Sequence, residues 1–263
     1  MRLAVSPGLK HRPEPLTVDP VRSVCTKGNL LLPETYDPQT QPSDYTSRMG
    51  KKTRRRKDRY DTSGHPEGEY VDDAKTILVN KLGITELEPL QLREEYALAK
   101  AYEALLGQVR IDTPLTCQLL KHIHTLIFGE LYEWAGRWRT VWIRKPGITW
   151  PPPDFIDQSM QVFERDTLRK YPATAVSDDD NFCSVAAEIQ GELLTIHPFR
   201  EGNARTIKLL TDLLAAQTGR PLLAYNQSDE GRDAYITAAT AAFRSDFAPL
   251  GEIIRRALEL AQT

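Results

Sequence analysis

The feature that most constrains the fold of this chain is a forced break between two amphipathic stretches. Apolar residues recur with helical spacing over 179–196 and again over 204–218. Between these stretches, Pro198 and Gly202 prevent one continuous helix. The sequence therefore predicts a helix, a short loop and a second helix, with the loop residues from His197 onward held by a helix on each side.

The loop combines a base, a carboxylate and the start of a helix. Gly202 and Asn203 open the second helix, where backbone N–H groups and the positive end of the helix dipole favour an anion. Arg205, in the first turn, adds a forked cation suited to phosphate. Glu201 offers the carboxylate oxygens that Mg²⁺ accepts when phosphates share the ion. His197 is a candidate general base toward a hydroxyl group.

The remainder of the C-terminal part is predicted to be mainly helical. The β-rich stretch 138–150, with a turn at Pro146 and Gly147, predicts one β-hairpin. Thr113 is expected to cap a helix that begins at Pro114. Further helices are expected over 73–82, 86–107, 114–128, 154–170, 229–244 and 247–261.

The N-terminal part has a different composition. Residues 1–50 hold seven of the 18 prolines and show no helical period, so they cannot bury enough apolar surface to offset the entropy of ordering. Residues 51–59 hold seven basic residues and one acidic residue. We expect a disordered arm over 1–60, first proline-rich and then basic, and a folded domain over 61–263. The basic run predicts a solvated tail, with nucleic-acid contact or a targeting signal as alternatives.

The whole-chain composition disfavours several classes of protein. The net charge of −2 is not that of a polycation. Cys25, Cys117 and Cys183 are odd in number and widely spaced, which argues against a disulfide framework or a zinc site and fits a reducing compartment. No membrane span and no secretory signal is visible. We therefore expect a cytoplasmic protein that does not contact a membrane, while secretion as an effector through a signal-independent route stays open.

The segment from His197 to Arg205 resembles the signature of the Fic (filamentation induced by cAMP) family, His-Pro-Phe-x-Asp/Glu-Gly-Asn-Gly/Lys-Arg. The similarity extends to Val79–Ile84, to Leu131–Val141 and to 234–250. It implies an all-α, Fic-type helical domain with a short β-hairpin flap. Most members of this family transfer AMP from ATP to a Ser, Thr or Tyr hydroxyl of a target protein.

By this resemblance, the chain is expected to be a nucleotidyltransferase of the protein adenylyltransferase type that uses ATP and Mg²⁺. His197 is the expected base and Glu201 the expected metal ligand, while Phe199 packs the loop into the core. The residues expected to bind the nucleotide phosphates are Arg200, Gly202, Asn203, Ala204, Arg205 and Lys208. The flap, at about 142–150, is expected to bind the target by strand addition through Ile143, Ile148, Thr149 and Trp150.

Two positions depart from the family pattern. Ala204 stands at the second glycine, and Lys208 stands where AMP-transferring members have a second arginine that meets the γ-phosphate. Lysine keeps the charge but loses the bidentate fork. One alternative is therefore a Fic-fold enzyme that transfers UMP or phosphate, and another is a catalytically silent module that binds nucleic acid or protein through 51–59. The family also leaves room for inhibition, by a small antitoxin partner or by the pattern Ser63–Gly68.

Overall fold

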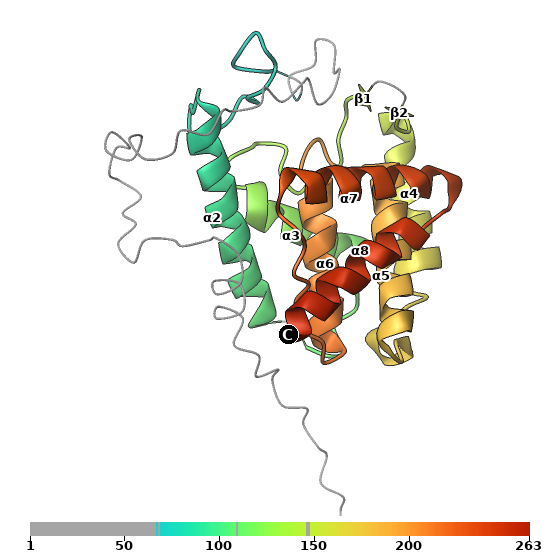
Figure 1. The fold of residues 1–263 in the computed structure, drawn as a ribbon. Coiled ribbons are helices and arrows are strands. Elements are labelled where there is room, and N and C mark those ends of the chain that lie inside the picture. Colours follow the sequence, from blue (N-terminus) through green and yellow to red (C-terminus); the bar gives the residue numbers. More distant parts are fainter. Residues whose placement is uncertain (1–66, 68, 109, 146–147) are drawn as a thin grey trace, which may run out of the picture.

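Helices make up most of the part of the chain that the structure, a computed structural model, describes: residues 67, 69–108, 110–145 and 148–263. The expectations for residues 1–60, including the basic run, lie outside this part. Figure 1 shows the helices and a short hairpin beside them. The helices are α2 (Leu87–Leu106), α3 (Cys117–Phe128), α4 (Ile156–Phe163), α5 (Asp179–Ile196), α6 (Asn203–Gln217), α7 (Asp229–Ala241) and α8 (Ala248–Gln262). The predicted all-α fold with one hairpin is confirmed.

The hairpin consists of two short antiparallel strands, β1 (Arg144–Lys145) and β2 (Ile148–Thr149). Arg144 pairs with Thr149, and Lys145 pairs with Ile148. Short 3₁₀ or π-helical segments extend the helices at Pro153–Phe155, Glu164–Leu168 and Ala242–Arg244, and a separate 3₁₀ turn lies at Ala173–Ala175. Among the described residues, no helix is both long and apolar enough to cross a membrane.

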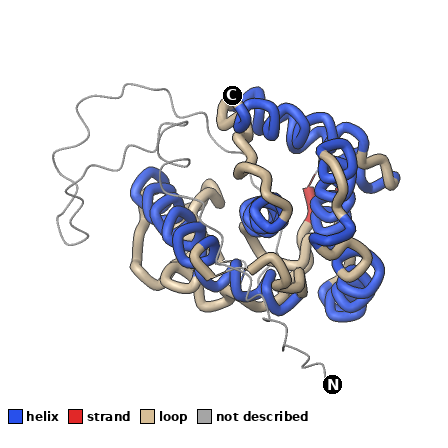
Figure 2. The backbone as a smooth tube through the Cα atoms, turned by 90° about the horizontal axis from the view of Figure 1, so that it is seen from below, coloured by secondary structure: helices blue, strands red, loops and turns tan. Residues whose placement is uncertain are grey.

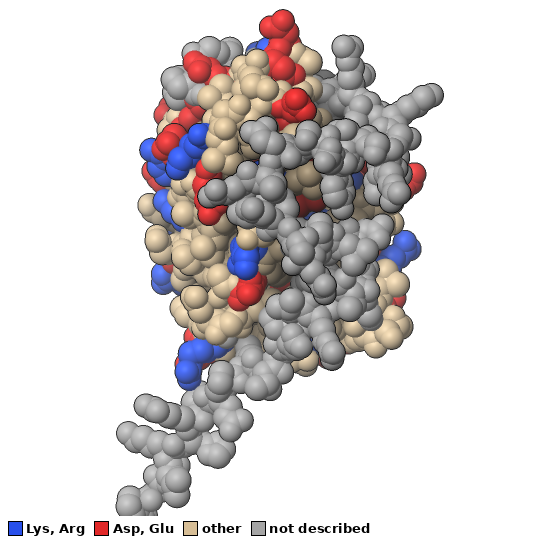
Figure 3. Space-filling view, turned by 90° about the vertical axis from the view of Figure 1, so that its left-hand side faces the viewer, with Lys and Arg blue, Asp and Glu red and all other residues tan. Residues whose placement is uncertain are grey.

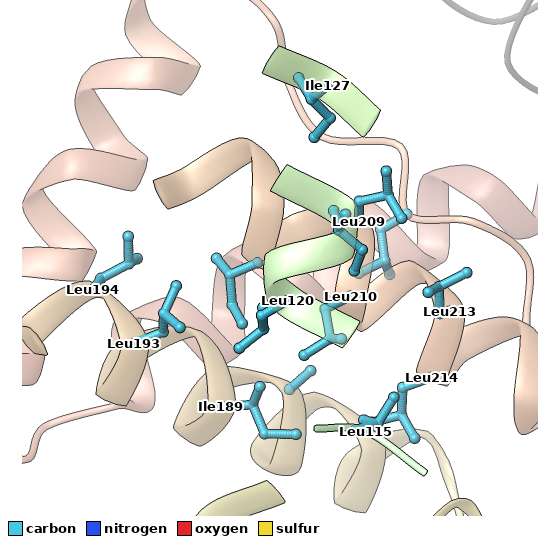
Figure 4. Packing of buried hydrophobic residues seen from close by; sticks show 14 of the residues in the cluster. Leu115, Leu120, Ile127, Ile189, Leu193, Leu194, Leu209, Leu210, Leu213 and Leu214 are labelled. Atoms are coloured by element: carbon cyan, nitrogen blue, oxygen red, sulfur yellow. The ribbon is translucent and has the colours of Figure 1, made fainter. Parts of the chain in front are cut away.

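Helix α6 is the centre of the domain. Twelve of its 15 residues are buried, and α2, α3 and α5 pack against it. Figure 2 looks at the bundle from below and shows one helix end-on in the middle, with the others around it. In Figure 4, Leu120 of α3, Leu193 of α5 and Leu210 of α6 converge in the core. Because the helix is enclosed, residues at its N-terminus have a rigid support.

The helix predicted over 73–82 is wrong. The Asp72 carboxylate accepts hydrogen bonds from the backbone N–H groups of Thr76, at 2.9 Å, and Ile77, at 2.8 Å. Lys75 has a left-handed backbone, with a φ of 52°. Local side-chain bonds of this kind offer the backbone an alternative to helix, and a turn results.

The start of α3 also differs from the prediction. The helix begins at Cys117 and not at Pro114, because Thr116 is the cap: its side chain accepts a hydrogen bond from the backbone N–H of Leu119 at 3.1 Å. Thr113 instead accepts a bond from the backbone N–H of Arg110, at 2.9 Å. The helix predicted over 154–170 is broken into α4 and its flanking segments, and the remaining predicted helices are observed.

Candidate active site

His197 ends α5 in a left-handed conformation, with φ 53° and ψ 59°. Its side chain is buried and lies against Trp150, with 4.5 Å between the ring centroids. Nδ1 is 3.2 Å from the carbonyl oxygen of Leu194. Because a carbonyl oxygen can only accept, this contact assigns the proton to Nδ1 and the lone pair to Nε2.

Burial lowers the pKa of His197 to about 3. The imidazole is therefore neutral at neutral pH, which is the form able to accept a proton. Trp150 donates its indole N–H to the same Leu194 oxygen, at 2.9 Å. Two side chains, one from α5 and one from the end of the hairpin, thus share one acceptor, and this arrangement orients the His197 ring.

The loop after His197 is braced by its own asparagine. The Oδ1 of Asn203 accepts the backbone N–H of Phe199 at 2.9 Å, and its Nδ2 donates to the Phe199 carbonyl at 2.8 Å. The Phe199 ring is fully buried and stacks on His124 at 3.9 Å between centroids. The structure thus places Phe199 in the core, and Asn203 bridges the two ends of the loop.

Gly202 allows the chain to enter α6. Its φ is 78°, and a Cβ atom there would overlap the ring of Phe128. The first intrahelical bond runs from Thr206 N–H to the Gly202 carbonyl, at 3.0 Å. The N–H groups of Asn203, Ala204 and Arg205 precede that bond, and such a helix start favours an anion.

Arg205 lies between two carboxylates and an aromatic ring. Its Nη1 is 2.7 Å from Glu94 Oε2, while its Nη2 is 4.0 Å from Glu201 Oε1. The guanidinium carbon is 4.7 Å from the ring centroid of Phe128. The Glu201 and Glu94 side chains retain only 13% and 12% of their exposure, so the three charges form a cluster with restricted access to water.

His124 is a site residue that sequence reasoning missed. Its Nδ1 accepts the backbone N–H of Gly136 at 2.9 Å, so its Nε2 carries the proton and donates to the Glu201 carbonyl at 3.0 Å. Burial lowers the pKa of His124 to about 3, which keeps it neutral. It therefore fixes the backbone of Glu201. Its position on the apolar face of the predicted 114–128 helix was the available signal.

Arg139, also missed, ties the hairpin to the loop. This buried guanidinium donates to the carbonyl oxygens of His197 at 2.8 Å, Val141 at 2.7 Å and Pro151 at 2.7 Å. Its backbone N–H donates to the Pro198 carbonyl at 2.8 Å. One side chain thus joins both ends of the hairpin to the residues that follow α5.

The predicted flap residues have two different environments. Ile143 and Trp150 are buried in a small cluster at the base of the hairpin. Ile148 and Thr149 instead line an open groove between β2 and the end of α7, together with Phe243. The structure therefore brings only the latter pair to a surface that a partner could reach.

Two predicted phosphate ligands are engaged by other groups. Arg200 is buried and donates to the carbonyl of Glu67 at 2.9 Å and to the hydroxyl of Tyr70 at 3.1 Å. The Lys208 ammonium lies over the rings of Tyr225 and Tyr235, at 4.2 and 3.9 Å from the centroids. Burial lowers the pKa of Lys208 to about 8.

The pattern Ser63–Gly68 falls mostly outside the described residues. Of its members the structure describes Glu67, whose carboxylate accepts hydrogen bonds from the backbone N–H of Thr140 at 3.1 Å and from its hydroxyl at 2.9 Å. The N-terminal side of the described chain is thereby attached to the segment that leads into the hairpin.

The donor chemistry of the site fits one kind of metal. Across the described residues, no group of three or more His, Cys, Asp or Glu side chains could hold an ion. Glu201 places one carboxylate in the same loop as the α6 N-terminus, and Mg²⁺ is commonly bound by one or two carboxylates together with substrate phosphates. The site therefore fits a Mg²⁺ ion that arrives with a nucleotide.

One braced loop of a helical domain presents a neutral histidine, a carboxylate and a helix N-terminus. Together these groups suit group transfer from an anionic substrate. Residues 114–215 match the model of the Fic/DOC family. Over this region the chain is similar to that family.

Two relatives extend the comparison. The protein adenylyltransferase VbhT of Bartonella schoenbuchensis is 32% identical over 161 residues, which are 61% of this chain and 33% of VbhT. The probable protein adenylyltransferase y4lH of Sinorhizobium fredii is 29% identical over 182 residues, 68% of this chain and 90% of y4lH. This chain thus spans about a third of the first relative and nearly all of the second.

Solved structures share the fold. The N-terminal FIC domain of Bep8 from Bartonella sp. 1-1C has a TM-score of 0.62 at 20% identity, over 74% of this chain and 96% of that domain. BepC from Bartonella tribocorum, with bound AMPPNP, has a TM-score of 0.59 at 22% identity, over 73% of this chain and 97% of that one. The predicted Fic-type fold is thereby confirmed.

Proposed function

We propose that this chain is a protein adenylyltransferase, which transfers AMP from ATP to a Ser, Thr or Tyr hydroxyl of a target protein. The observation that carries the proposal is that one braced loop presents the neutral His197 imidazole and the N-terminus of α6 together. The names of VbhT and y4lH support the same activity.

The residues have complementary roles in this reaction. The Nε2 atom of His197 accepts the proton of the target hydroxyl, whose oxygen attacks the α-phosphorus of ATP while pyrophosphate leaves. The N–H groups at the start of α6 and the Arg205 guanidinium stabilise the charge on the phosphates. Glu201 would hold Mg²⁺, which when bound neutralises part of the phosphate charge.

The electrostatics of the site make His197 a stronger base when substrate is present. Its pKa of about 3 reflects burial. The negative charge of a bound nucleotide favours the imidazolium and raises this pKa. Proton transfer is thereby coupled to nucleotide binding, because the imidazole gains basicity only when the phosphates lie beside it.

The groove beside β2 suits the target chain. Thr149 at its rim is exposed, and Ile148 is half-buried beside Phe243. A strand laid along the hairpin would gain main-chain hydrogen bonds while side chains enter the groove. We therefore assign target binding to Ile148 and Thr149, and assign Ile143 and Trp150 to holding the hairpin in place.

A paired labelling assay tests the activity. The protein is incubated with Mg²⁺, a cell lysate and ATP labelled at either the α- or the γ-phosphate. We expect transfer of the α-label only, and a loss of at least about 10²–10⁴-fold in His197→Ala. The exposed His122 on α3 gives a matched control, since His122→Ala should keep the activity of the wild type.

Other results would redirect the assignment. Transfer of the γ-label would make the protein a phosphotransferase, and transfer from UTP alone would make it a UMP transferase. Lys208 lies over two tyrosine rings, and this is the reason to test the γ-label and UTP.

The nucleic-acid alternative rests on 51–59, outside the described residues. On the face in Figure 3, basic and acidic side chains are interspersed where described atoms are visible.

A further inference from the structure

A carboxylate on α2 holds the arginine of the motif. Glu94 Oε2 lies 2.7 Å from Arg205 Nη1, although the two residues are 111 positions apart in the sequence. The other oxygen of Glu94, Oε1, accepts the hydroxyl of Tyr132 at 2.8 Å. Both oxygens of this largely buried carboxylate are therefore engaged by groups of defined position.

The two carboxylates beside Arg205 are not equivalent. The contact with Glu94 is a short, charge-assisted hydrogen bond, whereas Glu201 lies at 4.0 Å, four positions earlier in the loop that precedes α6. The ring of Phe128 supports the guanidinium from a third direction. Glu94 thus decides which carboxylate Arg205 approaches.

Glu94 is poorly placed to leave the site. It lies inside the 20-residue helix α2, which packs against α3 and α6. Leu90, one turn earlier, is buried in the core. A carboxylate that inhibits by blocking a phosphate ligand has to be displaced when the nucleotide binds, and displacement of Glu94 would break its hydrogen bonds with both Arg205 and Tyr132.

We propose that Glu94 is a positioning residue of the nucleotide site, which holds the Arg205 guanidinium toward the phosphates and off the Glu201 carboxylate. This inference rests on the proposed function, because it assigns phosphate to Arg205 and Mg²⁺ to Glu201. Without Glu94, Glu201 becomes the nearest acidic partner of Arg205. The arginine then competes with Mg²⁺ for that carboxylate.

Nucleotide binding at several Mg²⁺ concentrations tests this role without relying on turnover. The probe is AMPPNP, measured by titration calorimetry with the full chain. We expect Glu94→Ala to weaken binding about tenfold and to raise the Mg²⁺ concentration at half-maximal binding several-fold, as is usual for residues that orient metal ligands. Glu94→Gln preserves the shape of the side chain and loses its charge. Its affinity for AMPPNP should lie between those of the wild type and Glu94→Ala.

Two controls separate positioning from a general loss of structure. Glu103→Gln makes the same change on the exposed face of α2 and should bind like the wild type. In an Arg205→Ala background, Glu94→Gln should have no further effect, since the two residues act as one unit. Denaturant unfolding of each variant verifies that the fold is retained.

The outcomes distinguish this inference from the proposed function. If the wild type binds AMPPNP and Glu94→Ala matches it in affinity and Mg²⁺ dependence, the positioning role is wrong and the adenylyltransferase assignment stands. Tighter binding by Glu94→Ala would show an inhibitory carboxylate and also overturn the proposal. If the folded wild type binds no nucleotide with Mg²⁺, both are overturned.

Discussion

Two left-handed residues control the path of the loop at the scale of single residues. His197 has a φ of 53° and Gly202 a φ of 78°. The first ends α5 and the second starts α6, so the polar residues between them are held against the core by Phe199. At Gly202 the side-chain space is occupied by Phe128, which adds a steric requirement to the conformational one.

This double requirement predicts the stability of two alanine variants. Gly219→Ala introduces a side chain at a φ of 75° where a Cβ meets open space, so it should cost about 1–2 kcal/mol of the free energy of unfolding. Gly202→Ala has the same backbone strain and also overlaps the Phe128 ring, which adds about 1–3 kcal/mol. Urea denaturation measures both variants. Equal losses would contradict the steric argument.

The sequence predicted the residues of the loop but not those that hold them. His197, Glu201 and Arg205 share one short segment, so their spacing alone indicated a site. Arg139 lies 58 positions from its partner His197, and Glu94 lies 111 from Arg205. Such pairs depend on how helices pack, and no local period or turn signal encodes them.

At the scale of elements, the hairpin is positioned by side chains rather than by its own length. Its strands have two residues each, too few for an independently stable sheet. The Arg139 guanidinium donates hydrogen bonds to backbone carbonyl groups at both ends of the hairpin, and the indole N–H of Trp150 donates one to a backbone carbonyl of α5. The sequence indicated a hairpin from its β-rich composition, while its attachment through a buried arginine required the structure.

Arg139→Lys should therefore loosen the hairpin while leaving the bundle folded. Lysine keeps the charge but cannot bond three carbonyl groups with a planar fork. We expect amide hydrogen exchange over 141–150 to accelerate at least about tenfold, equivalent to about 1.4 kcal/mol of lost local stability. Arg137→Lys, on the same segment but exposed, is the matched control. Equal exchange in the two variants would argue against this role.

At the scale of the whole molecule, the domain surrounds α6 with helices and buries two neutral histidines beside its N-terminal loop. His124 from α3 and His197 from α5 approach this loop from different sides of the core. Most of the helices could be predicted because their segments have a clear apolar period, and the prediction for 73–82 failed because one aspartate redirected the backbone. The burial of both imidazoles is a property of the assembled domain.

These histidines make stability dependent on pH. Each binds a proton near pH 6.5 in the unfolded chain and, because burial lowers its pKa, only near pH 3 in the folded state. Between these values the unfolded state binds more protons, so the free energy of unfolding falls as the pH falls, by up to about 1.4 kcal/mol per pH unit for each histidine. Asp212 has the opposite effect on the free energy of unfolding below about pH 6, because burial raises its pKa to about 6. In that range its protonation favours the folded state as the pH falls.

His124→Gln isolates the contribution of one histidine. The variant loses some stability at every pH, but its free energy of unfolding should decline less steeply than that of the wild type between pH 6 and 4.5, by about 1.4 kcal/mol per pH unit. Urea unfolding at a series of pH values measures the two slopes. The exposed His122 provides the control, as His122→Gln should follow the wild-type slope. Parallel curves for His124→Gln and the wild type would show that His124 does not resist protonation in the folded protein.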